Sequence, residues 1–262
     1  MKLTASQLRQ LKEEGWLLLP EYFSAVEVAI LKREADRVLR LKDREEICFE
    51  KDGVTPRSAF GIHRYSEIFE TLRRHPRLVE PLMQVYGEPV YAHQFKVNAK
   101  SKFAGAVWQW HQDYGNWREK DGMPEAKAMN ISLFLDEVFP FNGPLMLVPK
   151  SHTRGVLPSQ QDTETTTFPL FTQADALVEE LCKQGGLVAP TGKPGSVLLF
   201  DSNLVHGSSG NMTPYPRKIL YLSLNACSNY IRTPTRPDYI AHTDFTPIDL
   251  LNDDALLAFS SD

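Results

Sequence analysis

The sequence predicts a mainly β fold with flanking helices, and three observations support this prediction. Short apolar segments with strand character recur from residue 89 onward, separated by Gly, Pro and Asn signals. The first third of the chain instead shows capping sequences followed by apolar residues at helical spacing. Short strands without long intervening helices are typical of an antiparallel sandwich or barrel.

Two capping boxes predict helices near the N-terminus. Thr4 and Gln7 have the required spacing, as do Ser24 and Glu27, so each serine or threonine can cap free amides. Apolar residues then recur every three or four positions after Ser24, which predicts a helix reaching about residue 43.

The rest of the N-terminal part, residues 1–88, is expected to hold two more helices at 66–74 and 76–86. Pro76 divides them, because proline suits a first helical turn. Residues 48–64 show no clear period, which predicts a loop able to reach a site.

Alternation is clearest in the segment "VYAHQFKVNAK", residues 90–100. Here Gln94, Lys96 and Asn98 share a polar face opposite an apolar one. Further strands are expected in "MNISLFL", "GPLMLVP", "GSVLLF" and "KILYLSLNA", with one helical interruption at 174–183.

Length and composition limit the class of protein. We expect one domain over 1–262, with a β core at 89–230 and a C-terminal extension at 231–262. Net charge is −4 from 29 basic and 33 acidic residues without a basic stripe, which argues against nucleic acid and anionic membranes. The three cysteines are scattered, and no signal-like or membrane-spanning run is seen, which predicts a cytoplasmic protein. We expect it to be a monomer or homodimer.

The segment "WHQDYGNW" raises the question of a metal site. On a strand, His111 and Asp113 would project to the same side, and both are good ligands for a divalent metal. Two histidines and one carboxylate suit non-haem Fe(II) that activates oxygen. The alternative is that both are hydrogen-bonded residues in an aromatic core, since an isolated H-x-D triplet is common.

A third ligand must come from elsewhere in the chain. His206 follows the apolar strand 197–200, and Arg217 eleven residues later could clasp a carboxylate in bidentate fashion. His152 is followed by a loop without such a strand, so His206 is preferred.

These residues resemble the iron- and 2-oxoglutarate-dependent dioxygenases of the phytanoyl-CoA hydroxylase type. The resemblance covers most of residues 1–230 and is carried by "WHQDYGNWREKDGMP", "NGPLMLVPKSH" and "PGSVLLFDSNLVHGSSGNMTPYPRK". Within that family the chain is similar to bacterial hydroxylases of small amino acids, those of proline (trans-4) and ectoine. "FEKDGVTPRSAFGIHR" favours the proline type.

The resemblance implies a double-stranded β-helix, which is a cupin-like jelly roll, with helices on one outer side. It implies Fe(II) bound by His111, Asp113 and His206, with 2-oxoglutarate and O2 as co-substrates and ascorbate as a reductant. It also implies a set of contacts to 2-oxoglutarate: Gln94, Asn98, Asn130, Ser208 and Arg217.

The expected reaction is hydroxylation of an unactivated C–H bond in a small free amino acid, L-proline or a cyclic relative. The alternatives are ectoine and a larger natural-product intermediate. An amino acid needs a cation for its carboxylate and an aromatic wall for its ammonium group. Four residues are candidates for these contacts, although the charged ones could equally be solvated: Lys96, Trp117, Arg57 and His63.

Two other classes of protein are alternatives to an oxygenase. A β-barrel binding module without turnover would not need the complete ligand set or Arg217. A serine hydrolase would need a G-x-S-x-G elbow, and "GSSG" at 207–210 lacks that spacing.

Overall fold

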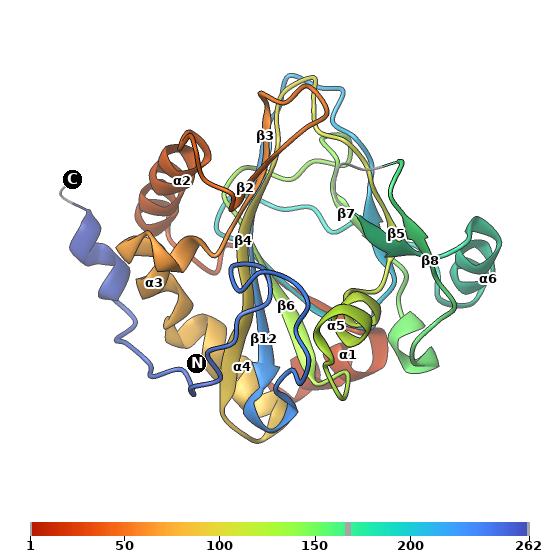
Figure 1. Cartoon of the computed structure of the whole chain (residues 1–262). Coiled ribbons are helices and arrows are strands. Elements are labelled where there is room, and N and C mark those ends of the chain that lie inside the picture. The colour runs from red at the N-terminus through yellow and green to blue at the C-terminus, as the bar shows by residue number, and fades with distance from the viewer. Residues whose placement is uncertain (1, 166–168, 261–262) are drawn as a thin grey trace.

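Two antiparallel sheets face each other at the centre of the protein (Figure 1). The structure is a computed structural model that describes residues 2–165 and 169–260. The strand orders are β1-β10-β6-β12-β4-β3-β2 in the large sheet and β7-β11-β5-β9-β8 in the small one. The predicted mainly β fold with flanking helices is confirmed. The strands are β1 (Trp16–Leu19), β2 (Ile47–Phe49), β3 (Pro56–Phe60), β4 (Val90–Lys100), β5 (Trp108–His111), β6 (Ala128–Phe134), β7 (Leu145–Leu147), β8 (Gln160–Asp162), β9 (Leu170–Thr172), β10 (Val197–Asp201), β11 (His206–Ser208) and β12 (Arg217–Ala226).

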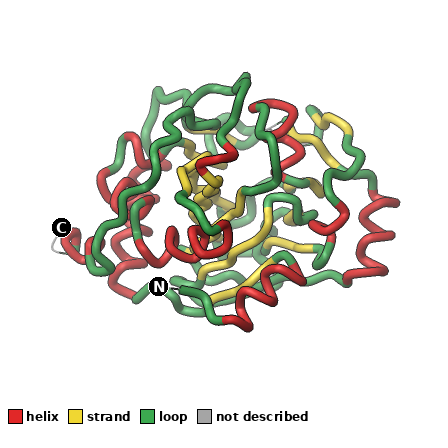
Figure 2. The backbone as a smooth tube through the Cα atoms, turned by 90° about the horizontal axis from the view of Figure 1, so that it is seen from below, coloured by secondary structure: helices red, strands yellow, loops and turns green. Residues whose placement is uncertain are grey.

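The helices lie around the outside of the two sheets (Figure 2). Three of them, α2, α3 and α4, cover the outer face of the large sheet (Figure 1). The helices are α1 (Ala5–Glu14), α2 (Ala25–Leu39), α3 (Glu67–Arg73), α4 (Pro76–Tyr86), α5 (Asp113–Asp121) and α6 (Asp175–Gly185), with short 3-10 turns at η1 (Ile62–Arg64), η2 (Ser151–Arg154), η3 (Cys227–Asn229) and η4 (Ala255–Phe259).

Both predicted capping boxes are present. The Thr4 side chain accepts from the Gln7 amide at 3.3 Å, and the Ser24 side chain accepts from the Glu27 amide at the same distance. Pro76 is the first residue of α4. The second helix ends at Leu39 rather than near residue 43, so its C-terminal limit was predicted too late.

The apolar side chains form two main core clusters on opposite faces of the large sheet. One cluster packs the sheet against the helices and includes Phe95 and Val97 of β4. The other lies between the sheets and includes Phe200, Ile219 and Tyr221. The polar face of β4 therefore points into the space between the sheets, because alternate residues of a strand lie on opposite faces.

The prediction of a loop at 48–64 was wrong. These residues form β2, β3 and η1, and β3 extends the large sheet by pairing with β4. Four of the five residues of β3 are buried, so the strand is covered on both faces and shows no polar–apolar alternation. The periodicity that identifies a half-buried strand was therefore absent.

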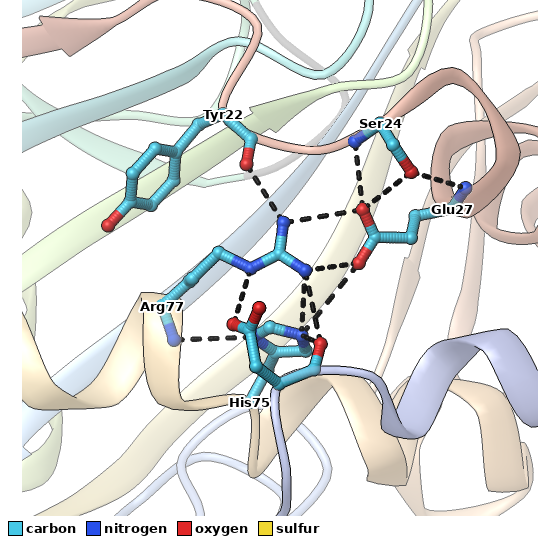
Figure 3. Close-up of polar contacts among 6 residues, drawn as sticks. Tyr22, Ser24, Glu27, His75 and Arg77 are labelled. Atoms are coloured by element: carbon cyan, nitrogen blue, oxygen red, sulfur yellow. Dashed lines mark hydrogen bonds and ion pairs between the residues drawn. The ribbon is translucent and has the colours of Figure 1, made fainter. Parts of the chain in front are cut away.

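Part of the C-terminal extension is held by a buried ion-pair cluster (Figure 3). Arg77, at the start of α4, donates to Glu27 of α2, to the Tyr22 carbonyl at 2.9 Å and to the Asp253 carboxylate at 2.7 Å. His75 contacts the Asp253 carbonyl at 3.0 Å. The cluster thus connects two helices with residue 253. The ends of the predicted domain, residues 1 and 261–262, lie outside the described residues, and its unity stays a prediction.

A helix must be both long and apolar to cross a membrane. None of the helices in 2–165 or 169–260 is long and apolar enough to cross one.

Candidate metal centre

Three predicted ligands converge between the two sheets. One donor atom from each of His111, Asp113 and His206 lies within 4.8 Å of the other two. The Asp113 carboxylate is 3.7 Å from His111 Nε2 and 3.5 Å from His206 Nε2. The two imidazole rings have centroids 4.1 Å apart. This is a facial set of two nitrogens and one oxygen, the donor set that suits non-haem Fe(II).

The backbone brings the two histidines together. Strands β5 and β11 pair in antiparallel fashion, and His111 is directly opposite His206 in that pairing. Gly207 follows His206, and a Cβ at this position would lie 3.0 Å from the Trp108 carbonyl. Glycine therefore allows the close approach of the two strands at the site.

Asp113 reaches the site in a different way from the one predicted. Strand β5 ends at His111, and Asp113 is the first residue of helix α5. The two side chains therefore do not share a strand face; they meet across a strand-to-helix junction. At the helix N-terminus the carboxylate also faces the positive end of the helix dipole, which favours its ionised form.

Backbone carbonyls fix the tautomer of both histidines. His111 Nδ1 lies 2.6 Å from the Gln109 carbonyl, and His206 Nδ1 lies 2.9 Å from the Leu204 carbonyl. Because a carbonyl only accepts, each Nδ1 must carry the proton and donate it. Each Nε2 is then left with a free lone pair directed at the site, the arrangement found in metal-binding histidines.

Two of the candidate ligands, His111 and Asp113, are in the protonation states that suit metal binding. Burial, followed by the neighbouring His206, lowers the pKa of His111 to about 3. Burial alone would raise the pKa of Asp113. The neighbouring His206, His111 and Lys96 outweigh burial, so that this pKa lies below its ordinary value. At neutral pH the His111 imidazole is thus neutral and the carboxylate charged.

Asn130 holds the carboxylate in place. Its Nδ2 donates to the Asp113 carboxylate at 2.7 Å, and its Oδ1 accepts from the Ser223 hydroxyl at 2.6 Å. The chain of two hydrogen bonds connects β12 through β6 to the metal ligand. Asn130 was predicted to contact 2-oxoglutarate. In the structure its side-chain amide orients the Asp113 carboxylate.

A cavity lies beside the three ligands, between the sheets. Its lining includes the ligands, aromatic walls and a set of polar side chains from β4, β11 and α5. The lining residues are Phe60, Gln94, Lys96, Asn98, Trp108, His111, Asp113, Asn116, Trp117, Asn130, Leu145, Leu170, Phe200, His206, Ser208, Tyr221 and Arg236.

Most of the predicted 2-oxoglutarate contacts lie on this cavity, but Arg217 does not. Gln94, Asn98 and Ser208 line it, and the Ser208 hydroxyl has no hydrogen-bond partner within the described ranges. Arg217 is 1% exposed, and its side chain contacts that of Tyr221. Its Nε and Nη1 also find no partner among the residues that the structure describes.

A buried lysine that was not predicted from the sequence accompanies Arg217. Lys100 is 2% exposed and stands directly opposite Arg217 in the pairing of β4 with β12. Burial, followed by the Arg217 and Arg57 charges, lowers the pKa of Lys100 to about 6. Lys100 comes two positions after Asn98, so it continues the inward row of β4 by one step. The alternation that identified Asn98 could have identified Lys100 as well.

A guanidinium and an ammonium group buried side by side are costly unless an anion lies between or beside them, and the lowered pKa of Lys100 reflects that cost. The pair lies one inward position beyond Asn98 and Ile219, at the end of the row that borders the cavity. The unpartnered guanidinium nitrogens of Arg217 and the buried side chain of Lys100 are therefore suited to bind a carboxylate at this end of the cavity.

Two of the four predicted substrate contacts line the cavity. Lys96 is half-buried, and its Nζ donates to the Gln94 side chain at 2.7 Å. Trp117 is 2% exposed and packs edge-on against His93, with ring centroids 4.8 Å apart. Trp117 lies on helix α5, which begins at Asp113.

The other two predicted substrate contacts do not line the cavity. Arg57 is buried on β3, where it pairs with Glu50 at 3.0 Å and lies 4.1 Å over the Trp108 ring. His63 is on η1 and stacks against Phe95 on the outer face of the large sheet. Their substrate roles stay predictions, but the 48–64 segment that was expected as a loop able to reach the site instead forms β2, β3 and η1.

Two polar residues of the cavity lining were also not predicted from the sequence. Asn116 is on α5, and Arg236 comes from the C-terminal extension, where it forms an ion pair with the buried Asp121. Arg236 lies in "TPTRPD", a segment without periodicity or motif, so no local signal could have placed it.

Comparisons with known proteins agree with this geometry. The family model described as phytanoyl-CoA dioxygenase matches residues 11–219. An ectoine dioxygenase of Sphingopyxis alaskensis is 37% identical over 88% of this chain and 79% of its own length. One from Bordetella bronchiseptica is 36% identical over 91% of this chain and 82% of its own.

A solved structure is also similar over nearly the whole chain. The crystal structure of EctD from S. alaskensis with 2-oxoglutarate and 5-hydroxyectoine has a TM-score of 0.85 and 35% identity. It covers 95% of this chain and 87% of that one. The similarity supports the cupin-like core that was predicted.

Proposed function

The chain belongs to the phytanoyl-CoA dioxygenase family, and from this premise we propose that it hydroxylates ectoine, a cyclic amidine carboxylate. It is an iron- and 2-oxoglutarate-dependent dioxygenase. One observation carries the choice of substrate: ectoine dioxygenases are 36–37% identical over 88–91% of the chain. These comparisons favour the alternative substrate, ectoine, over the predicted L-proline.

The residues present fit both iron and 2-oxoglutarate. His111, Asp113 and His206 would hold the iron, with the free Nε2 lone pairs and the ionised carboxylate as donors. Arg217 and Lys100 would hold the distal carboxylate of 2-oxoglutarate, since two guanidinium nitrogens of Arg217 find no partner among the described residues and Lys100 is buried opposite them. When bound, the two groups supply the oxidising chemistry that converts a C–H bond into C–OH with O2.

Positioning the substrate and excluding water are the tasks of the chain's own side chains. Ectoine carries a carboxylate and a delocalised amidinium cation. Lys96 and Arg236 on the cavity wall would attract the carboxylate, and the faces of Trp117 and Phe60 would pack against the ring and its cation. A fixed pose presents one C–H bond to the metal, and regiospecificity follows from that orientation.

The lining also suits a small substrate. Aromatic and aliphatic side chains from both sheets close the cavity, with Phe200 and Leu145 on the wall beside the ligands. A water-poor pocket strengthens each charged contact to the substrate. A larger natural-product intermediate would need these walls to move apart.

A substrate panel tests the proposal. Purified protein is loaded with Fe(II) under nitrogen and then given 2-oxoglutarate, oxygen and one compound at a time: ectoine, L-proline, L-pipecolate or no addition. Succinate release is measured and the product identified by NMR. We expect turnover with ectoine at least tenfold above that with proline, yielding 5-hydroxyectoine. Greater turnover with L-proline would contradict the choice of ectoine.

A further inference from the structure

The amide side chain between the first two metal ligands lies in a buried three-way contact. Gln112 is 1% exposed. Its Nε2 donates to the Asn203 carbonyl at 2.6 Å and to the Gly155 carbonyl at 2.9 Å. Its Oε1 accepts from the Leu157 amide at 2.9 Å. The Gln112 side chain thus makes three hydrogen bonds, all to backbone groups of other segments.

The contact with Asn203 leads to the third ligand. Asn203 lies three residues before His206, in a turn where its amide donates to the Asp201 carboxylate at 2.7 Å. In the same turn the Leu204 amide donates to the Asp201 carbonyl at 3.0 Å. The Leu204 carbonyl in turn accepts from His206 Nδ1 and orients the imidazole. A shift of the Asn203 carbonyl would therefore be transmitted to the ring.

The contacts with Gly155 and Leu157 hold the same turn from its other side. These residues follow η2, and the Ser151 hydroxyl of η2 accepts from the Val205 amide at 2.8 Å. The Ser151 hydroxyl also donates to the Val148 carbonyl at 2.7 Å. Residues 203 and 205 are thus both fixed by buried side chains, on either side of the carbonyl that orients His206.

We propose that Gln112 is a positioning residue that fixes His206 relative to Asp113, at the metal site on which the proposed function rests. Gln112 precedes Asp113 directly, so one side chain connects the segment of one ligand to the turn of another. Removal of its amide leaves the buried Asn203 carbonyl and Leu157 amide and the half-buried Gly155 carbonyl without this partner, and the two segments must shift to satisfy them. Loss of an outer partner of a metal ligand typically weakens metal binding by about 10- to 100-fold.

The test compares Gln112→Met with a matched control, Asn229→Leu. Asn229 is 3% exposed and also makes three hydrogen bonds: it donates to the Glu125 carbonyl and to the Asn225 side chain, and accepts from the Glu125 amide. It does not line the cavity. Both variants therefore lose three buried hydrogen bonds, but only one of them loses contacts to the ligand segments. Co(II) serves as the metal probe, with affinity from calorimetry and geometry from its ligand-field absorption.

Both variants should melt several degrees below the wild type. Gln112→Met should bind Co(II) about 10- to 100-fold more weakly, with an altered absorption spectrum, while Asn229→Leu stays within about twofold with the wild-type spectrum. Binding by Gln112→Met within twofold, with an unchanged spectrum, would overturn the assignment.

Two further outcomes are informative. If Gln112→Met does not fold, Gln112→Asn is used, which keeps the amide but is one methylene too short to span all three partners. It should weaken Co(II) binding by about tenfold, and unchanged binding would overturn the proposal. Wild-type protein that binds no Co(II) would refute the metal site itself, so that failure is distinguishable from a failure of the Gln112 assignment.

Discussion

Replacement of Lys100 by methionine tests the site assigned to the distal carboxylate of 2-oxoglutarate. The Lys100 side chain is buried opposite Arg217, and its Nζ donates to the Ala106 carbonyl at 2.7 Å. A hydrogen bond to a charged group contributes about 1.5–3 kcal/mol. Its loss in Lys100→Met should therefore weaken 2-oxoglutarate binding by about 10- to 150-fold at pH 6.

The pH dependence of binding gives a second, sharper signature. The pKa of Lys100 is lowered to about 6 in the ligand-free protein, mainly by burial. A carboxylate beside it favours the charged form, so binding takes up a proton above pH 6. The dissociation constant should then rise with pH, by about 50-fold between pH 6 and pH 8. This dependence should be absent in Lys100→Met.

The stability of the ligand-free protein should follow from the same pKa. Between about pH 6 and the ordinary lysine value of 10.5, the unfolded chain holds a proton that the folded chain lacks. The free energy of unfolding therefore rises with pH through this window, and Lys100→Met removes that rise.

Calorimetry of 2-oxoglutarate binding to Co(II)-loaded protein under nitrogen measures both the affinity and the proton uptake. Lys218→Met is the matched control, because Lys218 is the neighbour of Arg217 on β12 but pairs with Asp36 of α2. It should bind 2-oxoglutarate within about twofold of the wild type. The reasoning is refuted if folded Lys100→Met keeps the wild-type affinity and the wild-type pH dependence.

Three other substitutions have expected outcomes. Asp113→Asn removes the anionic ligand and should weaken Co(II) binding by more than about 100-fold; a loss below tenfold would contradict its role. His63→Phe should leave KM and kcat for ectoine within twofold, because His63 packs on the outer face of the sheet; a raised KM would return it to the substrate site. Arg77→Met breaks a buried ion pair with Glu27 and should lower the free energy of unfolding by about 3–5 kcal/mol in urea titrations, with KM unchanged.

The parts of the fold that were predicted from the sequence depend on local interactions. The capping boxes at Thr4 and Ser24 involve side chains three residues apart, so short sequence windows contain all the information. The inward row of β4 is similar, since strand alternation alone places Gln94, Lys96 and Asn98 on one face.

Other parts depend on distant contacts that no window contains. Helix α5 has almost no amphipathic pattern, because polar Asn116 and Asp121 are buried along with Trp117. The sequence pattern therefore did not indicate that a helix begins at Asp113. Arg236 reaches the cavity through its ion pair with Asp121, from 115 residues away in the sequence. The ligand set could be inferred because its residue types are rare in combination, whereas the substrate walls could not.

Isotope labelling during turnover tests the central claim most directly. Iron-loaded protein is incubated with ectoine and 2-oxoglutarate under 18O2, and the product is analysed by mass spectrometry alongside succinate. We expect hydroxyectoine that carries one 18O atom, formed in equal amount to ectoine-dependent succinate, and none from protein without iron. Succinate that does not depend on ectoine, or ectoine recovered unchanged, would contradict it.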